Sequence, residues 1–372
     1  MIRRSILLPI ALLFLLSASL SRAEWPPSFS GELGVLGASG ADAQPSKRAR
    51  SYVEPSVQWK TSEDGFGLNL RLSARAWQQL TETSGSSSSQ SQLEIRDSYV
   101  GYDTESTRVR LGFQSISWGE TFGFFVADLP NPRDLTDPLL LEIGHIKKPL
   151  FMLQGQSFFS GGGIQAFFAP VARHTELPLA IPRREFTDVG RDSEYGVRIN
   201  RLLSFGLDGS VFALRHHERG AVLDPQAIWS VGATASQSFG NDWVLRTDQV
   251  FTDLRQSTLD AWRGVFGLDW NGLENITLAG QAQRDPLNTG ASLRFTARGR
   301  SGFWDGAEFE VFWFHGIEVT ENWIQPKITY TTKSNLSVSL RYDWLDGSVI
   351  DPGLLRGLLR EDRGLLWLTY GF

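Results

Sequence analysis

The chain has 372 residues and contains no cysteine. It therefore has no disulfide, no thiolate nucleophile and no site in which cysteine binds a metal. It also contains no H-E-x-x-H, Walker A or G-x-S-x-G motif, and its 5 histidines show no spacing typical of a metal site or a hydrolase. We therefore expect a protein that is not an enzyme and that binds no metal and no cofactor.

Two further absences concern membranes and nucleic acids. After residue 24 no apolar run approaches the roughly 18 residues that a membrane-spanning helix needs. No block of lysine or arginine stands out and the formal net charge is −5, so nucleic acid is not an expected partner. Aromatic residues, in contrast, make up 12% of the chain. That share is too high for a disordered chain and suits the aromatic belts of a membrane protein.

The N-terminus has the three parts of a signal peptide. Arg3 and Arg4 are followed by the apolar stretch 5–20, and Ser21-Arg22-Ala23 forms a small-x-small cleavage site. The alternative is a single membrane-spanning anchor, for which the apolar stretch is slightly short. We predict that residues 1–23 are a removable signal peptide.

Segments of about ten residues alternate apolar and polar side chains, which is typical of transmembrane barrel strands. A soluble β-sandwich also alternates, but the length of these strands and the charges on their polar face favour a barrel. We predict that residues 24–372 form an all-β protein, a transmembrane antiparallel β-barrel of about 18 strands, or 16 if short strands merge. The predicted strands are 28–37, 50–61, 66–80, 91–103, 107–117, 150–158, 163–170, 193–200, 204–216, 227–239, 242–254, 259–270, 274–284, 290–298, 305–315, 320–332, 335–345 and 363–372.

The polar face of these strands is expected to line the lumen, and it is rich in arginine. These side chains either pair with acidic residues on other strands or form a ladder that guides an anionic solute. Asp97 falls on the apolar face and indicates either a β-bulge or a position near the membrane interface. The candidate lumen arginines are Arg71, Arg75, Arg110, Arg198, Arg294 and Arg341.

Short turns and longer connections alternate along the predicted strands. Barrels of the bacterial outer membrane have short periplasmic turns and long outer loops. Long outer loops are expected at 81–90, which is rich in serine, and at 118–149, 171–192 and 346–362.

The last strand has Leu366, Leu368, Tyr370 and the terminal Phe372 on one face. A final strand of this kind resembles the assembly signal of bacterial outer-membrane proteins. The resemblance implies that the barrel assembly machinery recognises this strand. It also implies a location in the outer membrane of a Gram-negative bacterium, with membrane lipid and lipopolysaccharide as partners.

The connection 118–149 is the strongest candidate for a functional segment, because long outer loops commonly carry barrel function. It includes Phe122, Phe124, Phe125 and 139–141, which would expose a large apolar patch if the loop projected outward. We therefore predict that it folds into the barrel or caps it, and that it constricts the pore. The candidate constriction residues are Trp118, Asp128, Asn131, Arg133 and Asp134.

The motifs in this region resemble those of a large group of proteobacterial outer-membrane proteins catalogued as a domain of unknown function. That group shows R-L-G-R-Q, then W-G, an Asp, and N-P-R-D. Here the corresponding runs are 110–114, Trp118-Gly119, Asp128 and 131–134, with Phe113 in place of the usual Arg. The resemblance covers about 96–150. It implies a porin-like barrel that moves hydrophobic or organic compounds, alongside an inner-membrane transporter system.

Two functions remain open from the sequence. The first is an outer-membrane channel or porin-like transporter for a small-molecule solute, narrowed by residues 118–149. The second is a non-conducting interaction or assembly barrel that belongs to an export or efflux system. The N-P-R-D turn could either brace the loop or contact the solute.

Overall fold

A computed structural model describes most of the chain after the predicted signal peptide. The prediction for residues 1–23 lies outside the described residues, as do parts of the predicted loops 118–149 and 346–362. The described residues are 28–40, 47–60, 66–83, 86–121, 124–136, 146–177, 182–219, 223–253, 262–285, 290–300, 306–318, 321–347 and 362–372.

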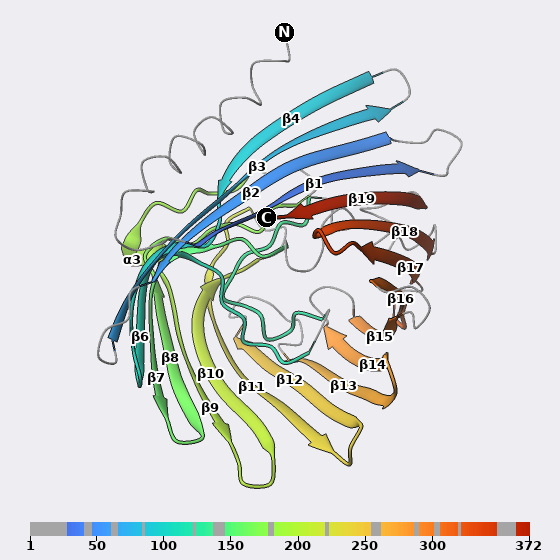
Figure 1. The fold of residues 1–372 in the computed structure, drawn as a ribbon. Helices are drawn as coiled ribbons and strands as arrows, with labels where there is room; N and C mark the ends of the chain where they lie inside the picture. The colour runs from blue at the N-terminus through green and yellow to red at the C-terminus, as the bar shows by residue number, and fades with distance from the viewer. Residues whose placement is uncertain are drawn as a thin grey trace.

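The strands form one closed antiparallel barrel (Figure 1). Each strand pairs with its neighbours in sequence, and β1 closes the ring by pairing with β19, from Glu32↔Gly371 to Gly40↔Arg363. The elements are β1 (Ser28–Gly40), β2 (Lys47–Lys60), β3 (Phe66–Thr83), β4 (Ser86–Ile95), β5 (Ser98–Thr104), β6 (Thr107–Gln114), β7 (Leu150–Phe159), β8 (Gly162–Ala169), α3 (Val189–Asp192), β9 (Glu194–Leu202), β10 (Leu207–His217), β11 (Ala227–Phe239), β12 (Trp243–Asp253), β13 (Trp262–Leu273), β14 (Ile276–Asp285), β15 (Gly290–Arg300), β16 (Ala307–Gly316), β17 (Glu321–Thr331), β18 (Leu336–Gly347) and β19 (Arg363–Gly371).

β4 and β5 are two halves of one barrel strand, so the barrel has 18 strands. Both halves pair with β3, and the register passes from Ala74↔Ile95 to Arg71↔Tyr99. The β4–β5 side therefore contains one extra residue, which defines a β-bulge. Asp97 lies in this bulge and accepts a hydrogen bond from the Ser115 backbone nitrogen at 2.8 Å. The predicted strand number and the predicted bulge are both confirmed.

Gly112 on β6 packs directly against the bulge. Its φ is +140°, and a Cβ added to it would lie 2.3 Å from the Ser98 carbonyl oxygen. A larger residue would need both a strained backbone and a displaced neighbouring strand. The glycine of the 110–114 motif is thus required by the bulge opposite it.

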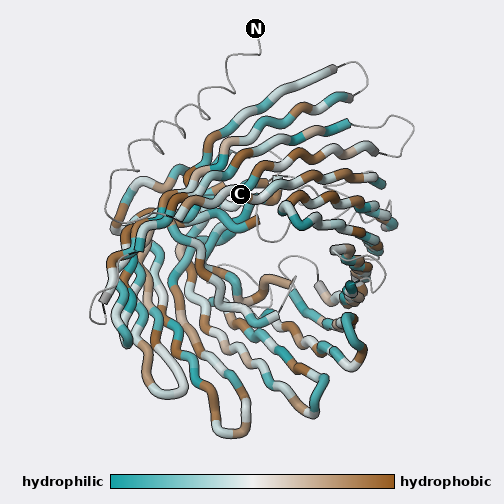
Figure 2. The backbone as a smooth tube through the Cα atoms, in the orientation of Figure 1, coloured by the Kyte–Doolittle hydropathy of each residue, from teal (hydrophilic) through white to brown (hydrophobic). Residues whose placement is uncertain are grey.

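Hydrophobic and hydrophilic residues alternate along the strands (Figure 2), and many of the hydrophobic ones are exposed on the outer face of the wall. Leu72 is 51% exposed, whereas its neighbour Ser73 is 5% exposed. Leu336, Leu340 and Leu368 are likewise exposed on the outer face. A continuous outer belt of this kind is the surface that a bilayer covers.

The two ends of the barrel differ in the length of their connections. One end carries tight turns, among them those at Asn275 and Asn335, which have positive φ. The other end carries the long connections that follow β6, β8 and β18. No helix among the described residues is long and apolar enough to cross a membrane.

The serine-rich segment 81–90 was predicted as a loop, and this prediction is wrong for most of it. β3 continues to Thr83 and β4 begins at Ser86, with Leu80 paired to Ser89. The backbone ladder satisfies the peptide groups whatever the side chains are, so a polar sequence can extend the hairpin beyond the apolar belt.

Candidate functional site

After β6 the chain leaves the wall and runs through the inside of the barrel. We call the described residues 115–121 and 124–136 the crossing segment, which Figure 1 shows in teal inside the ring of strands. Phe124 near its middle contacts Phe314 on β16, with ring centroids 6.3 Å apart. Trp118 contacts Phe212 on β10, with ring centroids 5.2 Å apart. The segment therefore joins distant parts of the inner wall.

An apolar cluster fixes the crossing segment inside the barrel. The alternation of the strands predicts a polar lumen, and this part of the lumen is not polar. The sequences of β10 and β16 do indicate apolar groups in the lumen. Val211–Leu214 and Val311–Phe314 are apolar without interruption and so place apolar side chains on both faces of the wall. The cluster consists of Ile116, Trp118, Phe124, Val126, Ala127, Leu129, Leu150, Met152, Phe167, Ala169, Phe212, Leu214, Val250, Val265, Phe312 and Phe314.

Trp118 lies at the centre of this cluster and is 0% exposed. Its indole nitrogen donates a hydrogen bond to the Gln165 side-chain oxygen at 2.8 Å. Its ring packs against Phe167 of β8 as well as Phe212. Trp118 thus packs inside the protein and presents no surface to a solute.

Asp128 and Asn131 hold the crossing segment in shape. The Asp128 carboxylate accepts a hydrogen bond from the Trp118 backbone nitrogen at 2.8 Å and lies 2.6 Å from the Lys147 ammonium. Asn131 accepts from the Ile116 backbone nitrogen at 2.7 Å and donates to the Lys148 carbonyl at 2.9 Å. Asp128 and Asn131 thus connect the beginning of the crossing segment to residues 147 and 148.

Arg133 and Asp134 also make contacts within the loops. Arg133 donates to the Phe125 carbonyl at 2.7 Å and lies over the Phe125 ring. Burial lowers the pKa of Arg133 to about 10, against the opposing effect of Asp128, so the guanidinium stays charged at neutral pH. The Asp134 backbone nitrogen donates to the Ile146 carbonyl at 2.7 Å, and its carboxylate accepts from the Thr136 backbone nitrogen at 3.0 Å.

Asp248 on β12 anchors the crossing segment to a distant part of the wall. Its carboxylate accepts hydrogen bonds from the Glu120 backbone nitrogen at 2.9 Å and from the Thr121 hydroxyl at 2.6 Å. Gly119 permits this approach, because a Cβ there would lie 2.9 Å from the Asp248 carboxylate. The glycine of the Trp118-Gly119 motif is therefore explained by contact with a residue far along the chain.

Three of the six candidate lumen arginines form ion pairs, and a fourth, Arg294, lies in the field of Glu310. Arg75 donates to Glu54 at 2.7 Å, Arg198 to Glu120 at 2.9 Å and Arg341 to Asp343 at 3.2 Å, while Arg294 lies over the Phe312 ring. The two remaining arginines differ. Arg71 forms no ion pair with any described residue, and neither does Arg110, whose guanidinium lies 4.6 Å from the centre of the Tyr99 ring.

A cluster of cations surrounds Glu94 beside the crossing segment. The Glu94 carboxylate lies 3.4 Å from the Lys148 ammonium and 3.7 Å from the guanidiniums of Arg96 and Arg173. Lys148 also pairs with Glu176. The cluster ties β4 to both the 118–149 and 171–192 connections.

Sequence reasoning missed Arg219, which connects three segments at the long-loop end. Its guanidinium donates to the Glu194 carboxylate at 2.7 Å, to the Arg173 carbonyl at 2.8 Å and to the Pro130 carbonyl at 3.1 Å. Glu194 is fully buried, so its charge depends on this partner. No local motif marks Arg219, because its acceptors come from three other parts of the sequence.

Replacing Arg219 by Lys is expected to loosen the crossing segment without removing the charge beside Glu194. Lysine cannot reproduce the planar fork of donors. We expect the free energy of unfolding to fall by about 1–2 kcal/mol, the contribution of one or two hydrogen bonds. We also expect a noisier open-channel current in planar bilayers. The control is Arg201→Lys on an exposed part of β9. Equal current noise in the two variants would contradict this role.

Comparisons with solved structures identify the fold. OccAB2 of Acinetobacter baumannii matches with a TM-score of 0.63 and 12% identity over 93% of this chain and 98% of that one. Pseudomonas aeruginosa OccK5 (OpdH) matches with a TM-score of 0.60 and 12% identity over 93% and 97% of the two chains. Pseudomonas aeruginosa OprD matches with 0.58 and 11% over 94% and 97%.

No family model matches the chain, and no curated protein matches its sequence. The predicted porin-like barrel is thus supported by structure, while the resemblance of residues 96–150 to the motif-bearing group stays a prediction. The closed ring of 18 strands and these similarities together show that the chain has the fold of OprD and the Occ proteins.

Proposed function

We propose that the protein is a channel of the bacterial outer membrane that passes small organic solutes and is narrowed by the crossing segment. The observation that carries this proposal is the path of the segment, which leaves the wall after Gln114 and reaches Asp248 and Phe314 on the other side of the lumen. The exposed apolar belt supports the membrane location. A lumen that contains both aromatic groups and arginines suits a solute with an apolar body and a negative charge.

Conductance in a planar lipid bilayer tests the channel. We expect discrete, voltage-stable openings from the purified protein. A barrel that serves only as a docking or assembly partner would insert without conducting. The proposed recognition of the C-terminal strand by the assembly machinery is tested separately, by the amount of folded Phe372→Ala protein in membranes.

Arg71 and Arg110 are expected to favour anions, because neither guanidinium is neutralised by an ion pair with the described residues. We predict that replacing both by Gln lowers the anion-to-cation permeability ratio. A unit charge about 4 Å from the ion path in water contributes about 1 kcal/mol, or roughly fivefold. The measurement is the reversal potential in a KCl gradient.

The matched control is Arg108→Gln, because Arg108 already pairs with Asp103 at 3.2 Å. Arg108→Gln should change the reversal potential less than Arg71→Gln or Arg110→Gln does alone. An unchanged reversal potential in the double variant would show that Arg71 and Arg110 do not face the ion path.

A further inference from the structure

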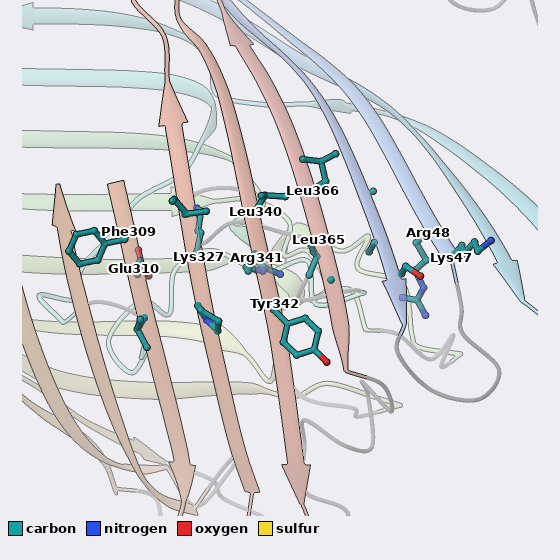
Figure 3. Close-up of a pocket in the computed structure, with 17 residues that line it drawn as sticks. Lys47, Arg48, Phe309, Glu310, Lys327, Leu340, Arg341, Tyr342, Leu365 and Leu366 are labelled. Carbon is teal, nitrogen blue, oxygen red and sulfur yellow. The ribbon is translucent and has the colours of Figure 1, made fainter. Parts of the chain in front are cut away.

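The outer face of the barrel contains a hollow of about 810 Å³ over β16 to β19 and the long-loop ends of β1 and β2 (Figure 3). Phe309, Ile328, Leu340 and Leu366 contribute apolar side chains to its lining. All four are exposed on the lipid-facing side, whereas Ser339 beside Leu340 is buried on the lumen side. The hollow therefore opens toward the membrane, while Glu310, Lys327 and Arg341 belong to the part of the wall behind it.

Two glycines and one proline create this hollow. Gly37 and Gly364 lie on the paired strands β1 and β19, and a Cβ added to either would meet no atom within 4 Å. Pro326 on β17 has no backbone N–H, and the β17–β18 pairing is interrupted between Ile324↔Trp344 and Lys327↔Arg341. The wall is thus thin and locally unpaired at this place.

A single cation lies at the long-loop end of the hollow. Lys47 begins β2 there and pairs with Ser39 of β1, while Glu82 lies opposite Lys47 in the register of β2 and β3. Tyr342 lies at the same end, where an aromatic ring with a polar tip suits the membrane interface. A ligand with an apolar chain and an anionic head would match both parts of the site.

We propose that this hollow binds one acyl chain of the phosphorylated glycolipid of the outer leaflet, with a headgroup phosphate beside Lys47. The inference rests on the proposed membrane location, which sets the long-loop end in the outer leaflet. The glycines provide the space for the chain, and the apolar side chains cover its methylenes. The ammonium of Lys47 supplies a point charge for the phosphate.

The test is native mass spectrometry of the full-length mature protein in detergent with added bisphosphorylated lipid A. The wild type is expected to retain one molecule. Gly364→Leu fills the hollow and should weaken retention about tenfold, the effect of roughly two lost methylene contacts. Lys47→Gln should weaken retention of lipid A but not of its dephosphorylated form.

Gly280→Leu is the matched control. Gly280 on β14 pairs with the lipid-facing Leu268 and Phe295, and a Cβ there also meets open space, so the same change is made outside the hollow. Equal retention by the Gly364 and Gly280 variants would overturn the proposal, and so would equal competition by phosphatidylethanolamine. Bilayer conductance of the same variants tests the channel function independently, because neither substitution faces the lumen.

Discussion

Trp118→Ala is expected to lower the free energy of unfolding by about 3–5 kcal/mol, the usual cost of truncating a large buried aromatic residue. The indole is fully buried between Phe167 and Phe212, so its removal leaves a cavity that rigid strands cannot close. The Gln165 side chain also loses the indole N–H as its hydrogen-bond donor. Denaturant unfolding in lipid vesicles measures the loss.

The same substitution should change conduction, because Trp118 fixes the beginning of the crossing segment. We expect a larger or less regular single-channel current than in the wild type. Trp344→Ala is the control, because Trp344 is 53% exposed on the outer face of β18 and contacts no part of the segment. If the two variants lost equal stability and conducted equally, Trp118 would not support a constriction.

The barrel itself could be predicted from sequence because the alternation that defines its strands involves only consecutive residues. A strand in a membrane must alternate between lipid and lumen, so the pattern around Leu72 and Ser73 determines both the element and its facing. Even the bulge was visible, since Asp97 broke the alternation and Tyr99 is buried on the inner side. Each of these inferences needs only a few consecutive residues.

The crossing segment could be predicted only in part, because its contacts are far apart in the chain. Its apolar content indicated an inward fold, but Thr121 and Asp248 are 127 residues apart and Pro130 and Arg219 are 89 apart. No spacing rule connects such residues. The apolar lumen cluster was missed for a related reason, since Phe212 and Phe314 occupy positions that the alternation assigns to polar groups.

The contacts also separate the motif residues by role. Asn131 uses its amide oxygen and nitrogen within the loop and wall, and Asp128 is occupied by a backbone nitrogen and Lys147. These contacts hold the crossing segment in shape. We therefore propose that the wall arginines act on a solute, above all Arg71 and Arg110, which have no ion pair with the described residues.

Leu340→Arg is expected to lower the free energy of unfolding by about 2–4 kcal/mol, because it places a charge near the middle of the lipid-facing belt. Leu340 is 53% exposed on the outer face, between Ile328 on β17 and Leu366 on β19. Ser337→Arg is the control on the same strand, since that position faces the lumen beside Thr331, where water can solvate a guanidinium. Both are measured as free energies of unfolding in phospholipid vesicles. The facing of β18, and with it the assignment of Arg341 to the pore, requires the cost at position 340 to exceed that at 337 clearly. Equal costs would place both faces in the same environment, which a closed barrel in a membrane does not allow.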